Sequence, residues 1–330
     1  MKKHLFPQSG QFYKANLHSH CTVSDGKLTP EEMKKAYQEK GYSVIAFTDH
    51  WFFVPHNDLT DENFVALNGY EMDVAEIRDG SNNRLGKTCH VCFIAGSPDR
   101  DCRPQNHDDI GNGTNGVVKD YSPEFISTMM EAGRKDGFFV TYNHPAWSQE
   151  TRDEYCNFHG MHAMEICNWG SYSSGYCDYN EKEYDEMLRA GKRIGCIGAD
   201  DNHNDGPKNT HRFGSFGAFT MIKAEGLDYA SIMDALFKGN YYASQGPLIH
   251  DVWMEGNQIH ITCSQARRVY LNTAHQYADA VWDEDESGIT HAVFTVLPEF
   301  GYVRLTVEDH RGYHANTRAF FIEEILEGTK

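Results

Sequence analysis

The chain has 330 residues, of which 40% are hydrophobic and 13% aromatic. This composition excludes a disordered protein, and no run approaches the roughly 18 apolar residues that a membrane-spanning helix needs. The formal net charge of -18 argues against a nucleic-acid surface, which requires clustered Lys and Arg. We therefore expect a globular protein that binds neither a membrane nor polymeric nucleic acid.

The N-terminus carries two lysines, but Gln8, Ser9 and Gln11 follow almost at once and leave no apolar stretch for a signal peptide. The cytoplasm is therefore the expected compartment. Nine cysteines without regular spacing do not resemble a disulfide framework.

Between about residues 13 and 244, β-rich runs alternate with capped amphipathic stretches, a pattern typical of strand-helix units around a parallel sheet or barrel. Thr29 is the predicted N-cap of the first helix, with proline at the first helical position. Glu32 is placed to close a capping box, and Gly41 ends the helix. A buried strand is predicted next, at Ser43–Phe47.

A second capped helix is predicted from Ser122 to about Lys135, with Gly137 ending it and a strand following at Phe138–Thr141. Further strands of this region are predicted at Ala15–Leu17, Phe64–Leu67, His90–Ile94, Met164–Cys167 and Arg193–Ile197. Further helices are predicted at Glu181–Ala190 and Tyr229–Lys238.

From about Gly246 the hydrophobic period changes to two, which indicates antiparallel strands. These strands are predicted at Gln258–Cys263, Arg268–Thr273, Thr290–Leu297 and Tyr302–Glu308. The pattern divides the chain into an α/β domain over residues 1–245 and a small β-sandwich-like domain over residues 246–330. The acidic run Asp283–Glu286 is expected to be a solvated loop.

His18 and His20 stand at positions i and i+2, so in a strand both imidazoles point to one face and can grip one cation. Similar ligand-type residues lie at or just beyond the carboxyl ends of other predicted strands, where barrel enzymes build their sites. They are Asp25, His50, Glu71, His144, Asp201 and His203. Imidazoles mixed with carboxylates suit zinc, manganese or iron(II) better than calcium or magnesium.

No thiolate belongs to this candidate set. The cysteines beside its segments are expected to pack in the core, because neighbours in a strand face opposite sides. They are Cys21, Cys89, Cys167 and Cys196. Asp49, for the same reason, is expected to point away from the metal or to support a ligand.

Five motifs between about residues 14 and 203 resemble the PHP (polymerase and histidinol phosphatase) family of metallohydrolases. They read NLHSH with a following SDG, then FTDH, GYE, NHP and DNH. The resemblance implies a distorted barrel of about seven strands, with two or three divalent cations at its carboxyl face.

Carried over residue by residue, the resemblance implies three ligand groups. The first consists of His18, His20, Glu71 and Asp201; the second of Asp25, His50 and His203; and the third of a bridging Glu71 with His90 and His144. The motif around His90 matches only loosely, so a structural histidine is the alternative there. Asp200 beside Asp201 leaves a one-residue ambiguity, and the spacing to His203 favours Asp201.

The reaction implied is hydrolysis of a small-molecule or nucleotide phosphate ester by a metal-bound hydroxide. Asp201, His203 and Glu71 are the candidate catalytic residues, with Asp201 orienting the attacking water. The segment Gly239–Pro247 and parts of the β domain resemble a PHP branch with carbaryl-hydrolase-like members. Carboxylic or carbamic ester hydrolysis is therefore one alternative, and a non-catalytic protein that binds metal or carbohydrate is another.

Candidate substrate residues lie in loops near the motifs. Trp147 is a candidate to line a pocket, although an aromatic loop residue is more often packing. Arg103 and Arg212 are candidates to neutralise a substrate anion. Glu165 either supports a metal ligand or forms a structural ion pair.

Overall fold

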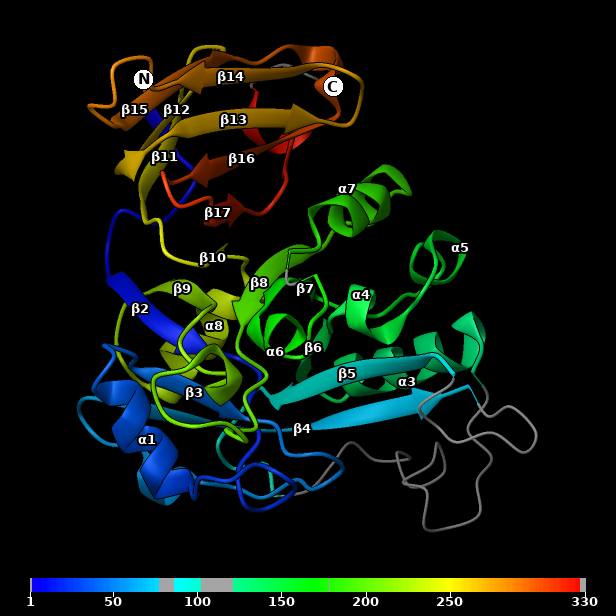
Figure 1. Ribbon diagram of the computed structural model, residues 1–330. Helices are drawn as coiled ribbons and strands as arrows, with labels where there is room; N and C mark the ends of the chain where they lie inside the picture. Colours follow the sequence, from blue (N-terminus) through cyan, green and yellow to red (C-terminus); the bar gives the residue numbers. More distant parts are fainter. Residues whose placement is uncertain (1, 77–85, 102–120, 178, 327–330) are drawn as a thin grey trace.

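The structure is a computed structural model that describes residues 2–76, 86–101, 121–177 and 179–326 (Figure 1). Its strands form a large sheet of 14 strands and a second sheet of four, both counted over the described residues. Helices accompany the large sheet, so the fold is mixed α/β. Within the described part of the chain, no helix is both long enough and apolar enough to span a membrane.

Elements of the first half are β1 (Lys2–His4), β2 (Gln11–Asn16), α1 (Pro30–Gln38), β3 (Val44–Phe47), η1 (Asn57–Leu59), β4 (Val65–Ala75), β5 (Thr88–Ala95), α3 (Pro123–Lys135), β6 (Phe138–Tyr142), α4 (Pro145–Ser148), α5 (Arg152–Tyr155), β7 (Ala163–Asn168) and α6 (Trp169–Ser173). Those of the second half are α7 (Glu181–Arg189), β8 (Gly195–Ala199), η3 (His211–Phe213), β9 (Phe219–Ala224), α8 (Tyr229–Phe237), β10 (Tyr241–Ser244), β11 (Ile249–Glu255), β12 (Gln258–Ala266), β13 (Arg268–Thr273), β14 (Ala278–Trp282), β15 (Ile289–Thr295), η4 (Pro298–Phe300), β16 (Tyr302–Glu308), β17 (His314–Thr317), β18 (Phe320–Phe321) and α9 (Ile322–Ile325).

Both predicted helix starts have the expected local chemistry. The Thr29 side chain accepts a hydrogen bond from the Glu32 backbone while the Glu32 carboxylate returns one to Thr29, so the capping box is complete. Ser122 caps α3 by accepting from the Phe125 backbone amide. These caps satisfy backbone donors that the first helical turn leaves unpaired.

The large sheet is mixed rather than parallel. Strands β2, β3 and β4 are parallel neighbours, as are β6, β7 and β8. Between the two groups, β5 pairs antiparallel with both β4 and β6. The sequence pattern predicted repeated strand-helix units, and this arm departs from that pattern because β4 runs on to Ala75 and pairs directly with β5 (Figure 1).

Hydrogen bonds bring the segments after β2 and β8 together. The Asp201 amide donates to the His18 carbonyl (2.9 Å), and the His20 amide donates to the Asn202 carbonyl (3.2 Å). Strand β9 runs antiparallel to β2. The segments that carry the first and last metal-ligand motifs are therefore neighbours in space.

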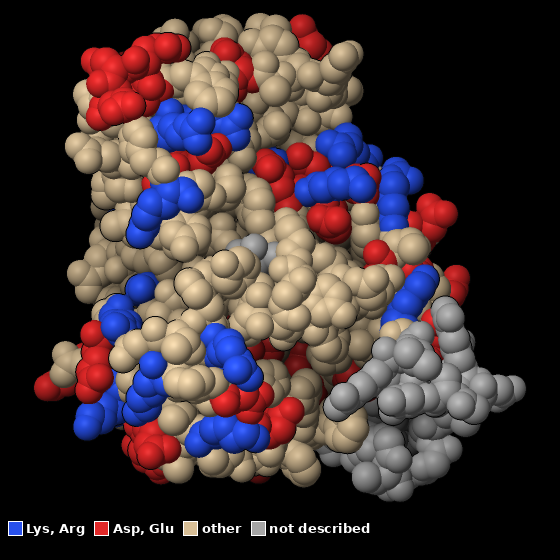
Figure 2. Space-filling view, in the orientation of Figure 1, with Lys and Arg blue, Asp and Glu red and all other residues tan. Residues whose placement is uncertain are grey.

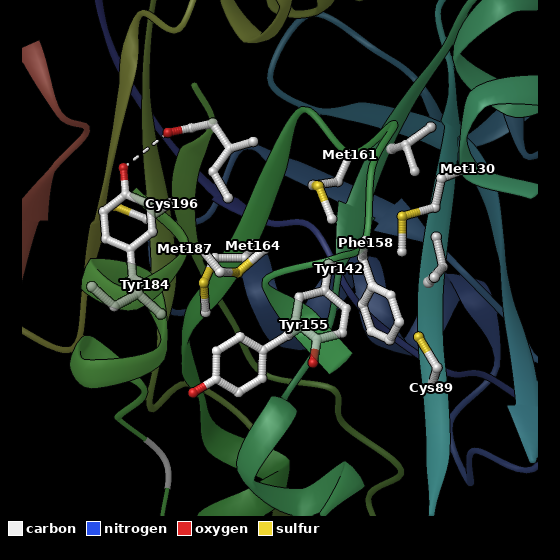
Figure 3. Packing of buried hydrophobic residues seen from close by; sticks show 14 of the residues in the cluster. Cys89, Met130, Tyr142, Tyr155, Phe158, Met161, Met164, Tyr184, Met187 and Cys196 are labelled. Carbon is white, nitrogen blue, oxygen red and sulfur yellow. Dashed lines mark hydrogen bonds between the residues drawn. The ribbon is translucent and has the colours of Figure 1, made fainter. Parts of the chain in front are cut away.

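The core around β5, β6 and β7 is rich in methionine and aromatic side chains (Figure 3). Met130, Met164 and Tyr142 are fully buried in it. At its edge the Tyr184 hydroxyl donates to the Ile194 carbonyl (3.0 Å). The predicted core cysteines are buried, as expected, and they are Cys21, Cys89, Cys167 and Cys196.

The strands after Gly246 are antiparallel, as predicted, but they divide between the two sheets. Strands β11, β12 and β15 form the four-stranded sheet with β1 from the N-terminus. Strands β13, β14, β16 and β17 instead extend the large sheet, through the pairing of β17 with β10. The boundary at residue 245 stays a prediction. Strand β1 belongs to the four-stranded sheet, although the sequence pattern assigned this N-terminal segment to the α/β domain.

The predicted acidic loop is a loop, with Glu284, Asp285 and Glu286 exposed. Asp283 differs, because its side chain is only 2% exposed. It accepts from the Gly288 amide (3.0 Å) and contacts His310 (3.2 Å). One acid of the run therefore anchors the loop while the other three meet solvent.

A buried arginine joins the two parts of the chain. Arg304 on β16 is fully buried, and its guanidinium contacts Asp185 (2.6 Å) and Glu181 (2.6 Å) of α7. It also donates to the Thr306 hydroxyl (2.8 Å). A cavity of about 740 Å³ lies beside this contact, between α7 and the strands β13 and β14.

We expect Arg304→Ala to lower the free energy of unfolding by about 3 kcal/mol, because it leaves two carboxylates without their buried partner. Denaturant unfolding of the full chain measures this change. Lys238→Ala is the matched control, since its pair with Asp234 is more than half exposed and should matter by less than about 0.5 kcal/mol. Equal effects of the two substitutions would contradict the assignment of Arg304 as the link.

Candidate metal centre

Nine predicted ligand side chains converge in the structure. His18 and His20 follow β2, His50 follows β3, His144 follows β6, and Asp201 and His203 follow β8. Glu71 and His90 lie inside β4 and β5 rather than beyond a strand end. Asp25 lies in the loop between β2 and α1.

Glu71 lies at the centre and is fully buried. Its Oε1 atom is 3.1 Å from His18 Nε2 and 3.0 Å from His90 Nδ1. Its Oε2 atom is 3.0 Å from His50 Nδ1 and 3.4 Å from His20 Nε2. His144 Nε2 lies 3.6 Å from Oε1, so this carboxylate faces five imidazoles, which arrive on four other strands or strand ends.

Asp201 faces the same space from the other side. Its Oδ1 atom is 3.0 Å from His20 Nε2 and 3.3 Å from His18 Nε2, and its Oδ2 atom is 3.6 Å from His144 Nε2. Asp25 lies further out, with its Oδ2 atom 3.4 Å from His203 Nε2. The cluster therefore extends from a buried floor to a solvent-accessible rim.

Four overlapping groups of these side chains have ligand atoms close enough to share a metal ion. They are His20 with Asp25, His50 and His203; His18 with Glu71 and His144; His18 with His20 and Asp201; and His50 with Glu71 and His90. The group at the rim contains the expected second set plus His20. The expected third set divides between two groups, although His90 and His144 both approach the Oε1 atom of Glu71, so the assignment of individual ions stays a prediction.

The contacts of His20 fit a bound cation. Its Nε2 atom lies 3.1 Å from His18 Nε2, and its Nδ1 atom is buried without a hydrogen-bond partner. This Nδ1 atom lies 3.9 Å from Asp25 Oδ1, beyond hydrogen-bond distance. Since buried polar atoms are normally paired, facing imidazole nitrogens and an orphaned one are what a divalent cation would satisfy.

The charges within the cluster shift each other's protonation in the metal-free protein. Burial alone would lower the pKa of His203, but Asp25 and Asp201 raise it to about 9. The pKa of His18 is likewise raised, against burial, chiefly by Asp201. Burial dominates at His90 and lowers its pKa.

The pKa values of the two central carboxyl groups shift in the opposite direction, downward. Burial would raise the pKa of Asp201, yet His18 and His20 bring it well below its ordinary value. Glu71 behaves in the same way, with His18 as the main opposing group. Both carboxyl groups are therefore ionised and ready to bind a cation.

Two ligands occupy backbone conformations that side-chain-bearing residues rarely adopt. His144 has φ 26° and Asp201 has φ 49°. Positive φ in a residue other than glycine carries a cost of order 1–3 kcal/mol, and such strain clusters at functional sites. Both side chains are turned into the cluster at the point where their strands end.

Glu165 contacts the predicted ligand His18 in a buried ion pair, so both alternatives left open by the sequence apply to the same contact. Its Oε1 atom is 2.7 Å from His18 Nδ1, and its Oε2 atom accepts from the His144 amide (3.0 Å) and from Asn168 Nδ2 (2.8 Å). All four groups are buried. A carboxylate on the far nitrogen of a ligating imidazole fixes its orientation.

The loop that carries Asp25 is held by Asp49. The Asp49 Oδ1 atom accepts from the Ser24 amide (3.0 Å) and hydroxyl (2.7 Å). Gly26 lets the loop approach the chain closely, because a Cβ atom there would lie 2.3 Å from the His20 carbonyl oxygen. Asp49 thus supports the cluster without entering it, as the strand alternation predicted.

Asp201 rather than Asp200 faces the cluster. Asp200 is buried on the opposite side, where it accepts from the backbone amides of Phe216, Gly217 and Ala218 at 2.7–3.0 Å. Sequence reasoning did not identify Asn143, whose Nδ2 atom donates to Glu71 Oε1 (3.0 Å). The only sequence feature that pointed to Asn143 was its position beside His144.

A cavity of about 590 Å³ opens onto the cluster. Trp147 and Arg212 both line it, together with Asp201 and His203. The Trp147 ring also packs against His144, with centroids 5.0 Å apart, so it holds a ligand as well as lining the cavity. The third substrate candidate, Arg103, lies outside the described residues.

No protein-family model and no curated protein matches the chain. Among solved structures, it is similar over 93% of its length to a two-domain protein from Bacteroides vulgatus that contains a predicted PHP-like metal-dependent phosphoesterase, at 15% identity, a TM-score of 0.46 and 94% coverage of that chain. It is similar over 62% to a predicted metal-dependent phosphoesterase from Bifidobacterium adolescentis, at 14% identity, a TM-score of 0.39 and 91% coverage of that chain. It is similar over 57% to an amidohydrolase from Chromobacterium violaceum with bound sulfate and no metal, at 17% identity, a TM-score of 0.38 and 87% coverage of that chain.

Metal binding to this cluster should become tighter as pH rises toward about 9, the pKa of His203. The raised pKa means that the metal-free protein holds protons on its imidazoles at neutral pH, and a metal must displace them. Calorimetric titration with Mn²⁺ in buffers of different ionisation enthalpy measures both affinity and proton release. Affinity that does not change between roughly pH 6 and pH 9, without proton release, would contradict this assignment.

Proposed function

We propose that the chain is a metal-dependent hydrolase that cleaves a small-molecule or nucleotide phosphate ester. The observation that carries the proposal is the convergence of nine imidazole and carboxylate side chains around the buried Glu71, beside an open cavity. The motifs that resemble those of the PHP family fall on these same residues. We further propose that the strands β2 to β8 form the distorted seven-stranded barrel of that family.

The cluster suits two or three divalent cations of the zinc, manganese or iron(II) type, held by His18, His20, Asp25, His50, Glu71, His90, His144, Asp201 and His203. Such cations, when bound, supply Lewis acidity and a water of lowered pKa. Glu71 is fully buried and acts by holding cations together rather than by touching substrate.

Asp201 and His203 take the roles nearest the substrate. Both line the cavity, and the Asp201 side chain is 15% exposed. Asp201 is therefore placed to accept a hydrogen bond from the attacking water and orient it. His203 and Asp25 hold the rim of the site, where the departing group leaves.

The distribution of charge on the protein favours a small anionic substrate over a nucleic-acid strand. Arg212 is exposed at the cavity wall and can neutralise a phosphate oxygen that the cations do not reach. On the face shown in Figure 2, Lys and Arg lie in small groups interspersed with Asp and Glu. With a net charge of -18, this surface supports a phosphate monoester or nucleotide over a nucleic-acid strand.

Chelation should abolish hydrolysis of p-nitrophenyl phosphate, and Mn²⁺ or Zn²⁺ should restore it. A p-nitrophenyl phosphodiester and a p-nitrophenyl carboxylic ester complete the panel. His20→Ala should lower turnover by about 100-fold or more, because removal of groups that merely support a metal ligand already costs 10- to 100-fold. Metal content, measured on the same samples, should fall with activity.

The control for His20→Ala is His310→Ala, which removes an exposed imidazole in the C-terminal part of the chain. It should keep full metal content and turnover. Metal-restored hydrolysis of the carboxylic ester alone would overturn the phosphoesterase in favour of a carboxylic or carbamic ester hydrolase. Metal binding with no turnover of any ester would favour a non-catalytic binding protein.

Arg212→Ala should raise KM for p-nitrophenyl phosphate by about tenfold with little change in kcat. A tenfold change in affinity corresponds to roughly 1.4 kcal/mol of binding free energy. An exposed cation at the cavity wall would contact the ester equally in the ground state and in the transition state, so its removal should change KM alone. Steady-state kinetics measure both constants. Arg267→Ala, at an exposed arginine on the turn between β12 and β13, should change neither.

An unchanged KM in Arg212→Ala would remove Arg212 from the substrate site. A fall in kcat with constant KM would instead assign it to the transition state, because only an interaction formed there lowers kcat alone.

A further inference from the structure

A second group of ligand-type side chains lies beside the cluster of nine and shares none of its members. It consists of Cys21 after β2, Asp49 after β3 and His56 before η1, and their ligand atoms lie within 4.8 Å of one another. Cys21 is fully buried, Asp49 is 2% exposed and His56 is 9% exposed. Three segments that are distant in sequence therefore bring sulfur, oxygen and nitrogen to one enclosed point.

The two oxygens of Asp49 have different tasks. Oδ1 accepts from the Cys21 amide (2.9 Å) and from both donors of Ser24, which anchors the loop. Oδ2 accepts from the Cys21 thiol (2.9 Å). The loop is thus held by one oxygen, and the other remains directed at the thiol.

One feature of this group has no explanation in protein contacts. The Asp49 oxygens both accept hydrogen bonds, from Cys21 and Ser24. The Nε2 atom of His56, in contrast, is buried without a hydrogen-bond partner. A cation between these side chains would supply that partner and would lie beside a buried carboxylate.

We infer that Cys21 Sγ, Asp49 Oδ2 and His56 Nε2 form a separate site for a Zn²⁺ ion. Sulfur, carboxylate and imidazole ligands together suit zinc, and three protein ligands leave one tetrahedral position for water. Binding forms the zinc–sulfur bond and releases the thiol proton to solvent. The thiolate and the carboxylate then offset the two positive charges of the ion.

The position of this site indicates a supporting role. Cys21 lies between His20 and Asp25 in the chain, and Asp49 directly precedes His50. An ion here would connect the two loops that deliver these ligands, and would join both to the segment at His56. The site takes no part in hydrolysis and does not depend on the proposed function.

Cobalt substitution tests the site directly. Co²⁺ bound to a thiolate has a near-ultraviolet sulfur-to-cobalt charge-transfer band, and none of the nine ligands of the neighbouring cluster is a cysteine. The full chain, stripped with chelator and reloaded with Co²⁺, should show this band. Cys21→Ser should abolish it and lower bound cobalt by one ion per chain, whereas Cys92→Ser should retain both.

Cys92 is the matched control because it is also buried and accepts a hydrogen bond from Asn143, beside the other cluster (3.0 Å). Cobalt binding without the band, or a band lost in Cys92→Ser but kept in Cys21→Ser, would overturn the inference. His56→Gln covers the case in which Cys21→Ser fails to fold: it retains the thiol, and it should weaken the band and lose one cobalt ion. Full cobalt content with an unchanged band in His56→Gln would also overturn the site.

Discussion

The contact between the Glu71 carboxylate and its ring of imidazoles is the interaction around which this fold is organised. A fully buried carboxylate loses its hydration, and only close opposite charge or a metal compensates for that loss. His18, His50 and His90 supply the partners, each within 3.1 Å of a Glu71 oxygen. Because these histidines come from three different strands or strand ends, the buried charge of Glu71 constrains the relative positions of those strands.

The antiparallel arm of β4 and β5 makes this arrangement possible. Glu71 is opposite Cys92 in the ladder, and His90 is opposite Asp73. Residues two apart in a strand share a face, so Glu71 and His90 lie diagonally on the same side of the arm. The antiparallel pairing of β4 and β5 in this register brings Glu71 Oε1 and His90 Nδ1 to 3.0 Å. The departure from regular strand-helix alternation therefore serves the site.

Local chemistry was predictable from the sequence, and long-range pairing was not. The capping box at Thr29 and the shared face of His18 and His20 follow from residues close in the chain. The pairing of β1 with β11, the contact of Glu165 with His18 and that of Arg304 with Asp185 depend on segments more than one hundred residues apart. Periodicity records which face of an element is apolar, but it carries no information about which distant polar group will arrive there.

Asp200 and Asp201 show how one strand end can serve both structure and site. Neighbouring residues point to opposite sides, so only one of two adjacent carboxylates can reach the cluster. Asp200 turns inward, where the Tyr37 hydroxyl donates to its Oδ2 atom (2.9 Å) and burial raises its pKa to about 6. Its backbone amide donates to Asn16 of β2 (2.9 Å), which ties β8 to the strand that leads to His18. Asp201 can then hold its positive φ, because both the side chain and the backbone amide of Asp200 are fixed by hydrogen bonds. The position of the predicted ligand Asp201 is thus set by its neighbour Asp200, whose carboxylate faces away from the cluster.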